Sequence, residues 1–329
     1  MMAKMYYDQD ADLAFLSDKT IGVIGYGNQG RAQAINLKDS GLKVIIGVRA
    51  DETQQQAASD GFATLSIEEA AKRAQVLLLL IPDEVMPAVF ESEVRPGLSQ
   101  GDALCFASGY NVAFKFIEPP TGVDVVMVAP RMIGAGVRDR YLEGKGFPSF
   151  ISVEQDATGD ALKTTLAIAK GIGSTKSGVM LLTFAQEAEL DLFTEQGFGP
   201  AFGGVLLAAI QTLVDAGYPV EAVLTELILS GEFAYSMQKI AEIGFFPQME
   251  LHSHTSQYGS MTRSVRYMIP QISQTLKEVL EEIRSGAFAK EWDAEQKAGL
   301  PVFNQIKEMR DQHPIAEWDR LTREAFRLD

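Results

Sequence analysis

Short, continuous apolar runs separated by polar, helix-forming segments dominate the first part of the chain. The runs lie at residues 21–24, 43–48, 76–81, 103–107, 123–129 and 149–153. Runs of this length predict strands of a parallel sheet that is covered on both faces. Because helical segments such as residues 66–73 lie between several of these runs, the pattern predicts βαβ units and a mostly parallel sheet.

From about residue 183 the apolar positions recur at helical spacing instead. Helices are predicted at residues 184–196, 204–216, 220–229, 233–243 and 270–285, followed by a charged tail to residue 329. No internal repeat or low-complexity linker is visible between the two patterns. We therefore predict two domains, an α/β Rossmann domain at residues 1–182 and an all-α domain at residues 183–329.

The first apolar run leads directly into a glycine-rich turn, Gly25-Tyr-Gly-Asn-Gln-Gly30, and a helix-forming segment comes next. Gly25 permits the sharp turn, Gly27 lets the backbone approach a pyrophosphate, and Gly30 lets the helix lie close to the strand. The start of the helix offers free N–H groups to the phosphates. A glycine-rich turn alone is weak evidence, but this strand-to-helix context predicts dinucleotide binding rather than a merely structural turn.

The second strand ends in residues 47–52, where a dinucleotide enzyme reads the adenosine ribose. Asp51 could accept hydrogen bonds from the ribose hydroxyls and would repel a 2′-phosphate. Arg49 could instead stack on adenine or pair with that phosphate. Both NADH and NADPH stay open as cofactors, and the acidic side chain favours NADH.

Three further strands end in polar segments that include Pro82-Asp83-Glu84, Ser108-Gly-Tyr110-Asn111 and Pro130-Arg131. Ligands of such sheets bind beyond the carboxyl ends of the strands. We therefore expect these segments to converge on the nicotinamide end of the cofactor.

Composition narrows the class of protein further. The chain has 329 residues, 46% of them hydrophobic, and a formal net charge of −15, which argues against nucleic acid or an anionic membrane as a partner. Its single cysteine, Cys105, excludes an internal disulfide and lies in an apolar run, so we expect a buried, inert thiol. No targeting segment is visible, and the apolar runs are too short to span a membrane. We expect a cytoplasmic protein.

Carboxylates of the helical part are the candidate metal ligands. Glu187, Asp191 and Glu195 are spaced four residues apart and share one helical face, which is typical either of a solvated acidic stripe or of a cation site. Glu226 lies in an otherwise apolar helix, where a carboxylate is costly unless it is paired or bound to a cation. Oxygen ligands of this type suit Mg²⁺.

Several motifs in order along the chain are similar to the class I ketol-acid reductoisomerase family: AKMYYDQDADL, IGYGNQG, LLIPDEV, VDVVMVAP, VRDRYLEGKGFP, DLFTEQ and SHTSQYG. The resemblance covers essentially the whole chain. It implies a Rossmann domain, a knotted all-helical domain that binds substrate and metal, and homodimers in which the two chains share active sites. It also implies a small-molecule substrate.

The resemblance assigns roles to individual residues. With the glycine turn and the strand ends, the expected cofactor-binding residues are Gly25, Tyr26, Gly27, Asn28, Gln29, Gly30, Arg49, Asp51, Asp83, Glu84, Val85, Met86, Pro130 and Gly134. Asp191 and Glu195 match two Mg²⁺ ligands of the family. Glu226 matches a third, supplied by the partner subunit in dimeric relatives, and Ser253 matches a serine that contacts substrate.

Four positions depart from the family pattern. Ser108 replaces a histidine, Arg131 a lysine, Ser230 a metal-binding carboxylate and Gln257 a glutamate. Arginine does not readily give up a proton, and serine is no acid near neutral pH. The expected catalytic residues are therefore Ser108, Tyr110, Arg131, Asp191 and Glu195, around a weakened Mg²⁺ site.

Three hypotheses for the function are consistent with these residues. The first is an NAD(P)H-dependent reductase of a small 2-keto acid or imine, in which the isomerase activity of the family is lost or weakened because metal-assisted alkyl migration needs more carboxylates than hydride transfer does. The second is a true ketol-acid reductoisomerase, which converts 2-acetolactate to 2,3-dihydroxyisovalerate in branched-chain amino-acid biosynthesis. The third is an inactive binding homologue.

Overall fold

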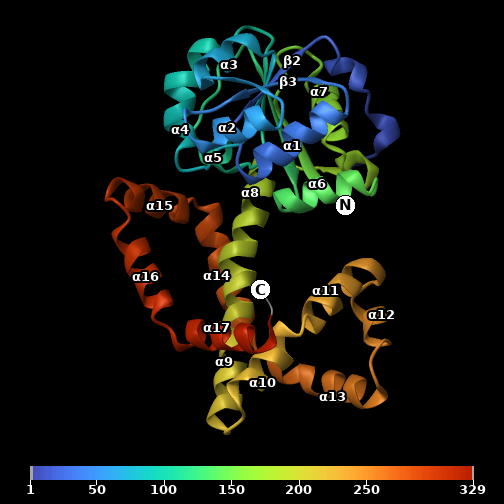
Figure 1. The fold of residues 1–329 in the computed structure, drawn as a ribbon, viewed down its shortest axis with the longest axis vertical. Helices are drawn as coiled ribbons and strands as arrows, with labels where there is room; N and C mark the ends of the chain where they lie inside the picture. Colours follow the sequence, from blue (N-terminus) through green and yellow to red (C-terminus); the bar gives the residue numbers. More distant parts are fainter. Residues whose placement is uncertain (1–2, 328–329) are drawn as a thin grey trace. The chain divides into compact units, whose positions relative to one another are not determined.

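The computed structural model describes residues 3–327 and divides into two compact units, one ending at Leu190 and the other beginning at Asp191. The first contains a nine-stranded sheet with helices, and the second is helical (Figure 1). This confirms the predicted fold class. The boundary at residue 182 and the knot stay predictions.

The sheet of the first unit is mostly parallel, with the strand order β1-β9-β8-β7-β6-β5-β2-β3-β4. Its strands are β1 (Met5–Tyr6), β2 (Thr20–Ile24), β3 (Lys43–Gly47), β4 (Ala63–Leu65), β5 (Val76–Leu79), β6 (Ala103–Phe106), β7 (Asp124–Pro130), β8 (Ser149–Gln155) and β9 (Val179–Leu181). Strand β8 pairs antiparallel with β7, and β1 with β9, while the other neighbours are parallel.

Helices cover both faces of this sheet (Figure 1). The helices up to the division are α1 (Asn28–Asp39), α2 (Glu52–Ser59), α3 (Ile67–Arg73), α4 (Met86–Val89), α5 (Tyr110–Ala113), α6 (Gly134–Leu142) and α7 (Ala161–Ile172), and α8 (Phe184–Phe193) crosses it. In β5, Val76 and Leu78 face the cluster under α1 and α7, and Leu77 and Leu79 face the cluster under α3. Since alternate residues point to opposite faces, both faces need apolar side chains.

The second unit is built from α9 (Gly199–Asp215), α10 (Val220–Leu224), α11 (Glu232–Ile243), α12 (Phe245–Met249), α13 (His254–Ser264), α14 (Pro270–Arg284), α15 (Ala287–Lys297), α16 (Pro301–Asp311) and α17 (Pro314–Phe326). A small core around Ile210, Val223 and Leu224 joins α9, α10 and α17. Figure 1 shows α11–α13 and α15–α16 extending away from these helices. Many large apolar side chains of the unit are therefore exposed.

The structure corrects the predicted break between helices 184–196 and 204–216. Helix α8, a π-helical turn η6 (Thr194–Phe198) and α9 form one continuous helix. Close packing explains the glycine at position 197 inside this helix. A Cβ there would lie only 3.1 Å from Phe193 and 3.3 Å from Leu276. Pro200 is tolerated because it is the second residue of α9, just after the wide turn, where the α-helical hydrogen-bond ladder is interrupted.

This helix, Phe184–Asp215, also has the length and apolar composition of a membrane-spanning segment, although the sequence patterns predicted none. Only 11% of its apolar window is buried within the structure. A core helix of a soluble protein can have the same length and composition, so this helix alone does not define a membrane protein. What it does show is an extended apolar surface that the described chain leaves uncovered.

Candidate active site

The glycine-rich turn joins β2 to α1 at the carboxyl end of the sheet. Gly25 has a φ of +95°, which favours glycine, and its N–H donates to the Gly47 carbonyl oxygen at 2.9 Å. A Cβ on Gly30 would lie 2.3 Å from the Gly25 carbonyl oxygen, so glycine is needed for α1 to begin this close to the turn. Gly27 is the N-cap of α1, and a Cβ there would meet no atom within 4 Å. This open space beside the first N–H groups of a helix fits a pyrophosphate.

The loop that leaves β7 is tied to this turn. Pro130 ends the strand, and Gln29 Nε2 donates to the Met132 carbonyl oxygen at 2.8 Å. Gly134 packs closely on Asn28, whose carbonyl oxygen would lie 2.0 Å from a Cβ at position 134. Candidate cofactor-binding residues from two distant segments thus lie together, and the Gln29 amide is already used to join them.

The loops after β5 and β6 are joined by a buried amide. Asn111 Nδ2 donates to the Asp83 carbonyl oxygen at 3.2 Å and to Asp83 Oδ1 at 3.0 Å. Met86 is buried beside Asn111, whereas Glu84 and Val85 are exposed. The post-strand loops therefore converge as expected, while their contact with a nicotinamide stays a prediction.

Of the expected proton donors, Ser108 lies in the loop after β6 and Tyr110 is the first residue of α5. Ser108 Oγ accepts a hydrogen bond from the Tyr110 N–H at 3.2 Å. The Tyr110 ring is buried, edge-on to Phe114 and stacked with Phe116. Their assignment to proton transfer stays a prediction.

Glu187, which the sequence analysis grouped with Asp191 and Glu195 by its spacing alone, has a different role in the structure. Its side chain has no exposed surface, so it is not part of a solvated stripe. Its carboxylate accepts from the Gly109 N–H at 2.5 Å and from Arg131 Nη2 at 2.8 Å, and the Arg131 guanidinium also lies over the Phe150 ring. A buried carboxylate needs such partners. Glu187 therefore fixes the loops after β6 and β7 relative to each other.

The expected ribose-binding side of the turn is also held by charged groups. The Tyr26 hydroxyl donates to Asp60 Oδ2 at 2.9 Å, and Arg31 Nε donates to the same oxygen at 2.7 Å. The Arg31 hydrogen bond is the main cause that lowers the pKa of Asp60 to about 2, while burial and Asp60 raise the pKa of Tyr26. After β3, Arg49 Nε lies 4.0 Å from Asp51 Oδ2.

The candidate metal ligands Asp191 and Glu195 lie one turn apart along the continuous helix, with Glu195 in the π-helical turn η6. Partial burial, and then the neighbouring Asp191 carboxylate, raise the pKa of Glu195. Two carboxylates in such an arrangement fit a divalent cation, since a cation relieves their repulsion.

Glu226 and Ser253 differ from the sequence-based picture. Glu226 lies in a second π-helical turn, η7 (Thr225–Leu229), and its side chain is exposed, so the argument from an apolar environment was wrong for the single chain. Ser253 caps α13 by accepting from the Ser256 N–H at 3.2 Å. Among residues 3–327, no three His, Cys, Asp or Glu side chains gather as a metal site. The chain by itself does not bring Glu226 to Asp191 and Glu195.

An α/β sheet with a glycine turn, converging post-strand loops and a helical second unit defines a nicotinamide-dependent oxidoreductase. Two family models match, "Acetohydroxy acid isomeroreductase, NADPH-binding domain" over residues 15–178 and "Ketol-acid reductoisomerase, C-terminal domain" over residues 184–327. The chain belongs to the ketol-acid reductoisomerase family.

Individual relatives agree over the full length. A curated relative from Methanocaldococcus jannaschii, "Ketol-acid reductoisomerase (NADP(+))", is 43% identical over 100% of this chain and 99% of its own. The structure of an NADH-preferring ketol-acid reductoisomerase from an uncultured archean is 37% identical, with a TM-score of 0.93 over 98% of each chain. A semialdehyde dehydrogenase NAD-binding protein from Cupriavidus necator, 18% identical with a TM-score of 0.62 over 82% of this chain and 99% of its own, shares the fold.

These findings overturn the first functional hypothesis. A reductase of keto acids or imines that has lost isomerisation is not supported, because the chain matches a ketol-acid reductoisomerase over its whole length. That hypothesis gave four substitutions more weight than the overall similarity. The family membership also makes the chain an enzyme that uses a nicotinamide cofactor and a small-molecule substrate, so the inactive homologue is set aside.

Proposed function

We propose that this protein is a ketol-acid reductoisomerase that converts 2-acetolactate to 2,3-dihydroxyisovalerate, in the cytoplasm, within branched-chain amino-acid biosynthesis. The observation that carries the proposal is the 43% identity to the M. jannaschii enzyme over the full chain. We further propose that residues 1–182 bind the dinucleotide and residues 183–329 bind substrate and metal.

The proposed reaction has two steps, alkyl migration and hydride transfer, and the residues of the α/β domain serve the second. The Gly25–Gly30 turn binds the pyrophosphate, and the loops after β5, β6 and β7 orient the nicotinamide. Arg131, held by Glu187, orients the substrate carboxylate or a developing oxyanion. Ser108 or Tyr110 supports proton transfer to the reduced oxygen.

Mg²⁺ is the proposed metal. Asp191 and Glu195 of one chain, with Glu226 of another, would hold it, and Ser253 would contact substrate. Bound Mg²⁺ supplies the polarisation of the hydroxyl and carbonyl oxygens that alkyl migration requires. Because Ser230 replaces a carboxylate, we expect weak Mg²⁺ affinity rather than loss of turnover.

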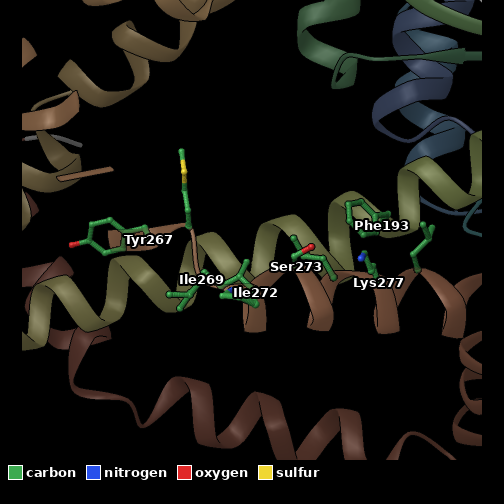
Figure 2. A pocket seen from close by; sticks show the side chains of 10 residues that line it. Phe193, Tyr267, Ile269, Ile272, Ser273 and Lys277 are labelled. Carbon is green, nitrogen blue, oxygen red and sulfur yellow. The ribbon is translucent and has the colours of Figure 1, made fainter. Parts of the chain in front are cut away.

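The proposed assembly is a homodimer with shared active sites. Between α14 and the helix that contains η6, an open apolar groove of about 520 Å³ is lined by residues that include Phe193, Tyr267, Ile269 and Ile272 (Figure 2). A second copy that covers such surfaces would supply the missing carboxylate as well as buried apolar area. The preferred cofactor is left open by the relatives, since one is named for NADP(+) and another prefers NADH.

Steady-state oxidation of NADH and NADPH tests the proposal. The substrates are 2-acetolactate and its already isomerised 2-keto product, each with and without Mg²⁺. We expect metal-dependent turnover of 2-acetolactate, and its loss in Asp191→Asn but not in Asp293→Asn, a carboxylate paired with Lys297 on α15. Turnover of the 2-keto product alone in the unmodified protein would contradict the proposed function.

A further inference from the structure

Helix α1 carries a stripe of polar side chains on a face that is buried in the α/β unit. The stripe consists of residues spaced four, three and four positions apart, which places them on one side of the helix: Gln29, Gln33, Asn36 and Ser40. Gln33 and Asn36 are almost completely buried, with exposed fractions of 1% and 0%. Burial of an amide side chain is costly unless it finds hydrogen-bond partners, so the neighbours of the stripe must supply them.

Helix α6, which packs on α1, supplies most of these partners. Asn36 Nδ2 donates to the Val137 carbonyl oxygen of α6 at 3.3 Å and to the Ile172 carbonyl oxygen at the end of α7 at 3.1 Å. Asn36 Oδ1 accepts from Arg138 Nη1 at 2.8 Å. Arg138 Nη2 in turn lies 2.7 Å from Asp39 Oδ2 of α1. The Asn36 amide therefore uses both its nitrogen and its oxygen to hold α6, and Arg138 holds α1 at two places.

Both ends of the stripe are hydrogen-bonded as well. Gln33 Nε2 donates to Gln29 Oε1 at 3.0 Å, and Gln29 Nε2 donates to the Met132 carbonyl oxygen in the loop before α6 at 2.8 Å. At the other end, Ser40 Oγ and the Tyr141 hydroxyl oxygen of α6 lie 2.9 Å apart. Hydrogen bonds are directional, whereas apolar contacts are not, so this contact between α1 and α6 favours a single position of α6 along α1.

The position of α6 matters because α1 and α6 begin at the two parts of the candidate site. Helix α1 begins at the glycine turn, and α6 begins at Gly134, with only Met132 and Ile133 between it and Arg131. On its other side, the Arg131 N–H donates to the Pro148 carbonyl oxygen at 2.9 Å. A shift of α6 along α1 would therefore move the backbone of Arg131 relative to a cofactor at the glycine turn.

We propose that Asn36 and Arg138 are positioning residues for hydride transfer, which hold α6 in place along α1 and thereby hold Arg131 at a fixed distance from the nicotinamide. Both act through Arg131 and contact neither substrate nor cofactor. The inference rests on the proposed function, in which Arg131 orients the substrate. The Arg138 and Asp39 side chains are 26% and 43% exposed, so their ion pair contributes little to the stability of the fold. Loss of Arg138 should therefore affect the reaction more than it affects folding.

Single-turnover reduction of the already isomerised 2-keto product by the full-length protein, followed by the fluorescence of the reduced nicotinamide, tests this. Alkyl migration does not enter this reaction, and a deuterated cofactor verifies that the measured step is hydride transfer. We expect N36A and R138A each to slow this step about tenfold, while the Kd of the reduced cofactor changes less than about twofold. The double variant should be about as slow as each single variant, because both residues act through the same contact between α1 and α6.

A matched control is Q155A. The Gln155 amide also donates to two carbonyl oxygens, those of Pro120 and Val123, but it pairs with the start of β7, at the opposite end of the strand from Arg131. Q155A should leave the rate of hydride transfer unchanged, whatever it does to the free energy of unfolding. If N36A fails to fold, R138A still decides the test, because the Arg138 side chain is partly exposed.

An unchanged rate of hydride transfer in R138A overturns the inference. An equal loss of rate in Q155A, or a double variant slower than each single variant by a further factor of about ten, does so as well. Turnover of 2-acetolactate by the unmodified protein, together with an unchanged rate in R138A, defeats this inference alone. Slower reduction of the 2-keto product in R138A, without turnover of 2-acetolactate by the unmodified protein, defeats the proposed function alone.

Discussion

The two units of the chain differ in how completely they bury their apolar side chains. The α/β unit buries them in two clusters, one on each face of the sheet, so that strands such as β5 are covered completely. The helical unit has a small core around Ile210, and leaves side chains such as Phe246, Met261 and Met268 largely exposed. Burial of apolar surface is the main stabilising contribution to folding. The first unit therefore covers its apolar residues within one chain, whereas the second leaves an apolar surface that the homodimer proposed above would cover.

Their candidate site residues differ in the same way. In the α/β unit, Glu187, Asn111 and Gln29 are engaged in hydrogen bonds that join separate loops. In the helical unit, Glu226 is exposed and is not gathered with other potential ligands among residues 3–327. The α/β half of the candidate site is therefore held by contacts within the chain, whereas the carboxylates of the helical half would be brought together by the homodimer proposed above.

The rate at which a reagent labels the Cys105 thiol tests whether the α/β unit is stable by itself. It lies in β6, and burial raises its pKa to about 12. Since the thiolate forms only when the sheet opens, we expect a thiol reagent to react at least about 1,000-fold more slowly in native buffer than in denaturant. Dilution of the protein to dissociate dimers should not speed the reaction. Rapid native labelling would show that the sheet opens readily.

A charged substitution in the exposed apolar groove tests whether this surface of the helical unit forms the dimer interface. Ile272 lines the groove beside α14, and we expect I272D to raise the dimer dissociation constant by about 100-fold, with loss of Mg²⁺-dependent turnover. The matched control is L142D, since Leu142 is also a large exposed apolar residue but belongs to α6. Sedimentation velocity across a concentration series measures both variants. An I272D protein that stays dimeric removes the groove from the interface.

Substitution of Glu187 tests how much its buried ion pair with Arg131 contributes to stability and to turnover. We expect E187Q to lower the free energy of unfolding by about 2 kcal/mol, because the Arg131 guanidinium loses its ion pair with Glu187. We also expect kcat to fall about tenfold with a smaller change in KM, since Arg131 is no longer held in place. E68Q is the control, as Glu68 forms an exposed ion pair with Lys72, and no measurable change is expected there. Chemical denaturation and steady-state kinetics give both readouts.

The smallest expected effect concerns pH. The pKa of Asp60 lies near 2, below its ordinary value, so its pair with Arg31 stabilises the fold above about pH 4 and this contribution is lost as the pH falls toward 2. D60N should therefore lower Tm by about 3 °C at pH 7 and leave it unchanged near pH 2. E317Q, on the exposed surface of α17, should not change Tm at either pH. A difference for D60N that persists at pH 2 would assign the effect to packing.

Local patterns sufficed to predict much of the α/β unit. The apolar runs predicted β2, β3, β5, β6, β7 and β8, and the glycine turn was placed correctly before α1. The short strands β1, β4 and β9 were missed, because two or three residues carry too little pattern to be distinguished from a loop. The antiparallel β8 could not be distinguished from a parallel strand, since both are apolar when covered on two faces.

The candidate site was less predictable from the sequence. Spacing placed Glu187 on a face with Asp191, but its partners Gly109 and Arg131 stand 78 and 56 residues away in the sequence. Such pairs are set by how the loops meet in space. The substitutions at Ser108, Arg131 and Ser230 led to a wrong functional hypothesis because each was judged alone, without the contacts that support Arg131.

The π-helical turns at Thr194–Phe198 and Thr225–Leu229 have a consequence for the length of the chain itself. A π turn accommodates an extra residue within a helix, and each residue of an α-helix turns the remainder of that helix by about 100°. Deleting one residue in either turn would therefore restore a regular helix and leave the later side chains on nearly the same faces. By contrast, an insertion within the regular turns of α8, which no wide turn absorbs, would rotate the later side chains by about 100°. The two wide turns are therefore where the gain or loss of a single residue least disturbs which side chains share a helical face.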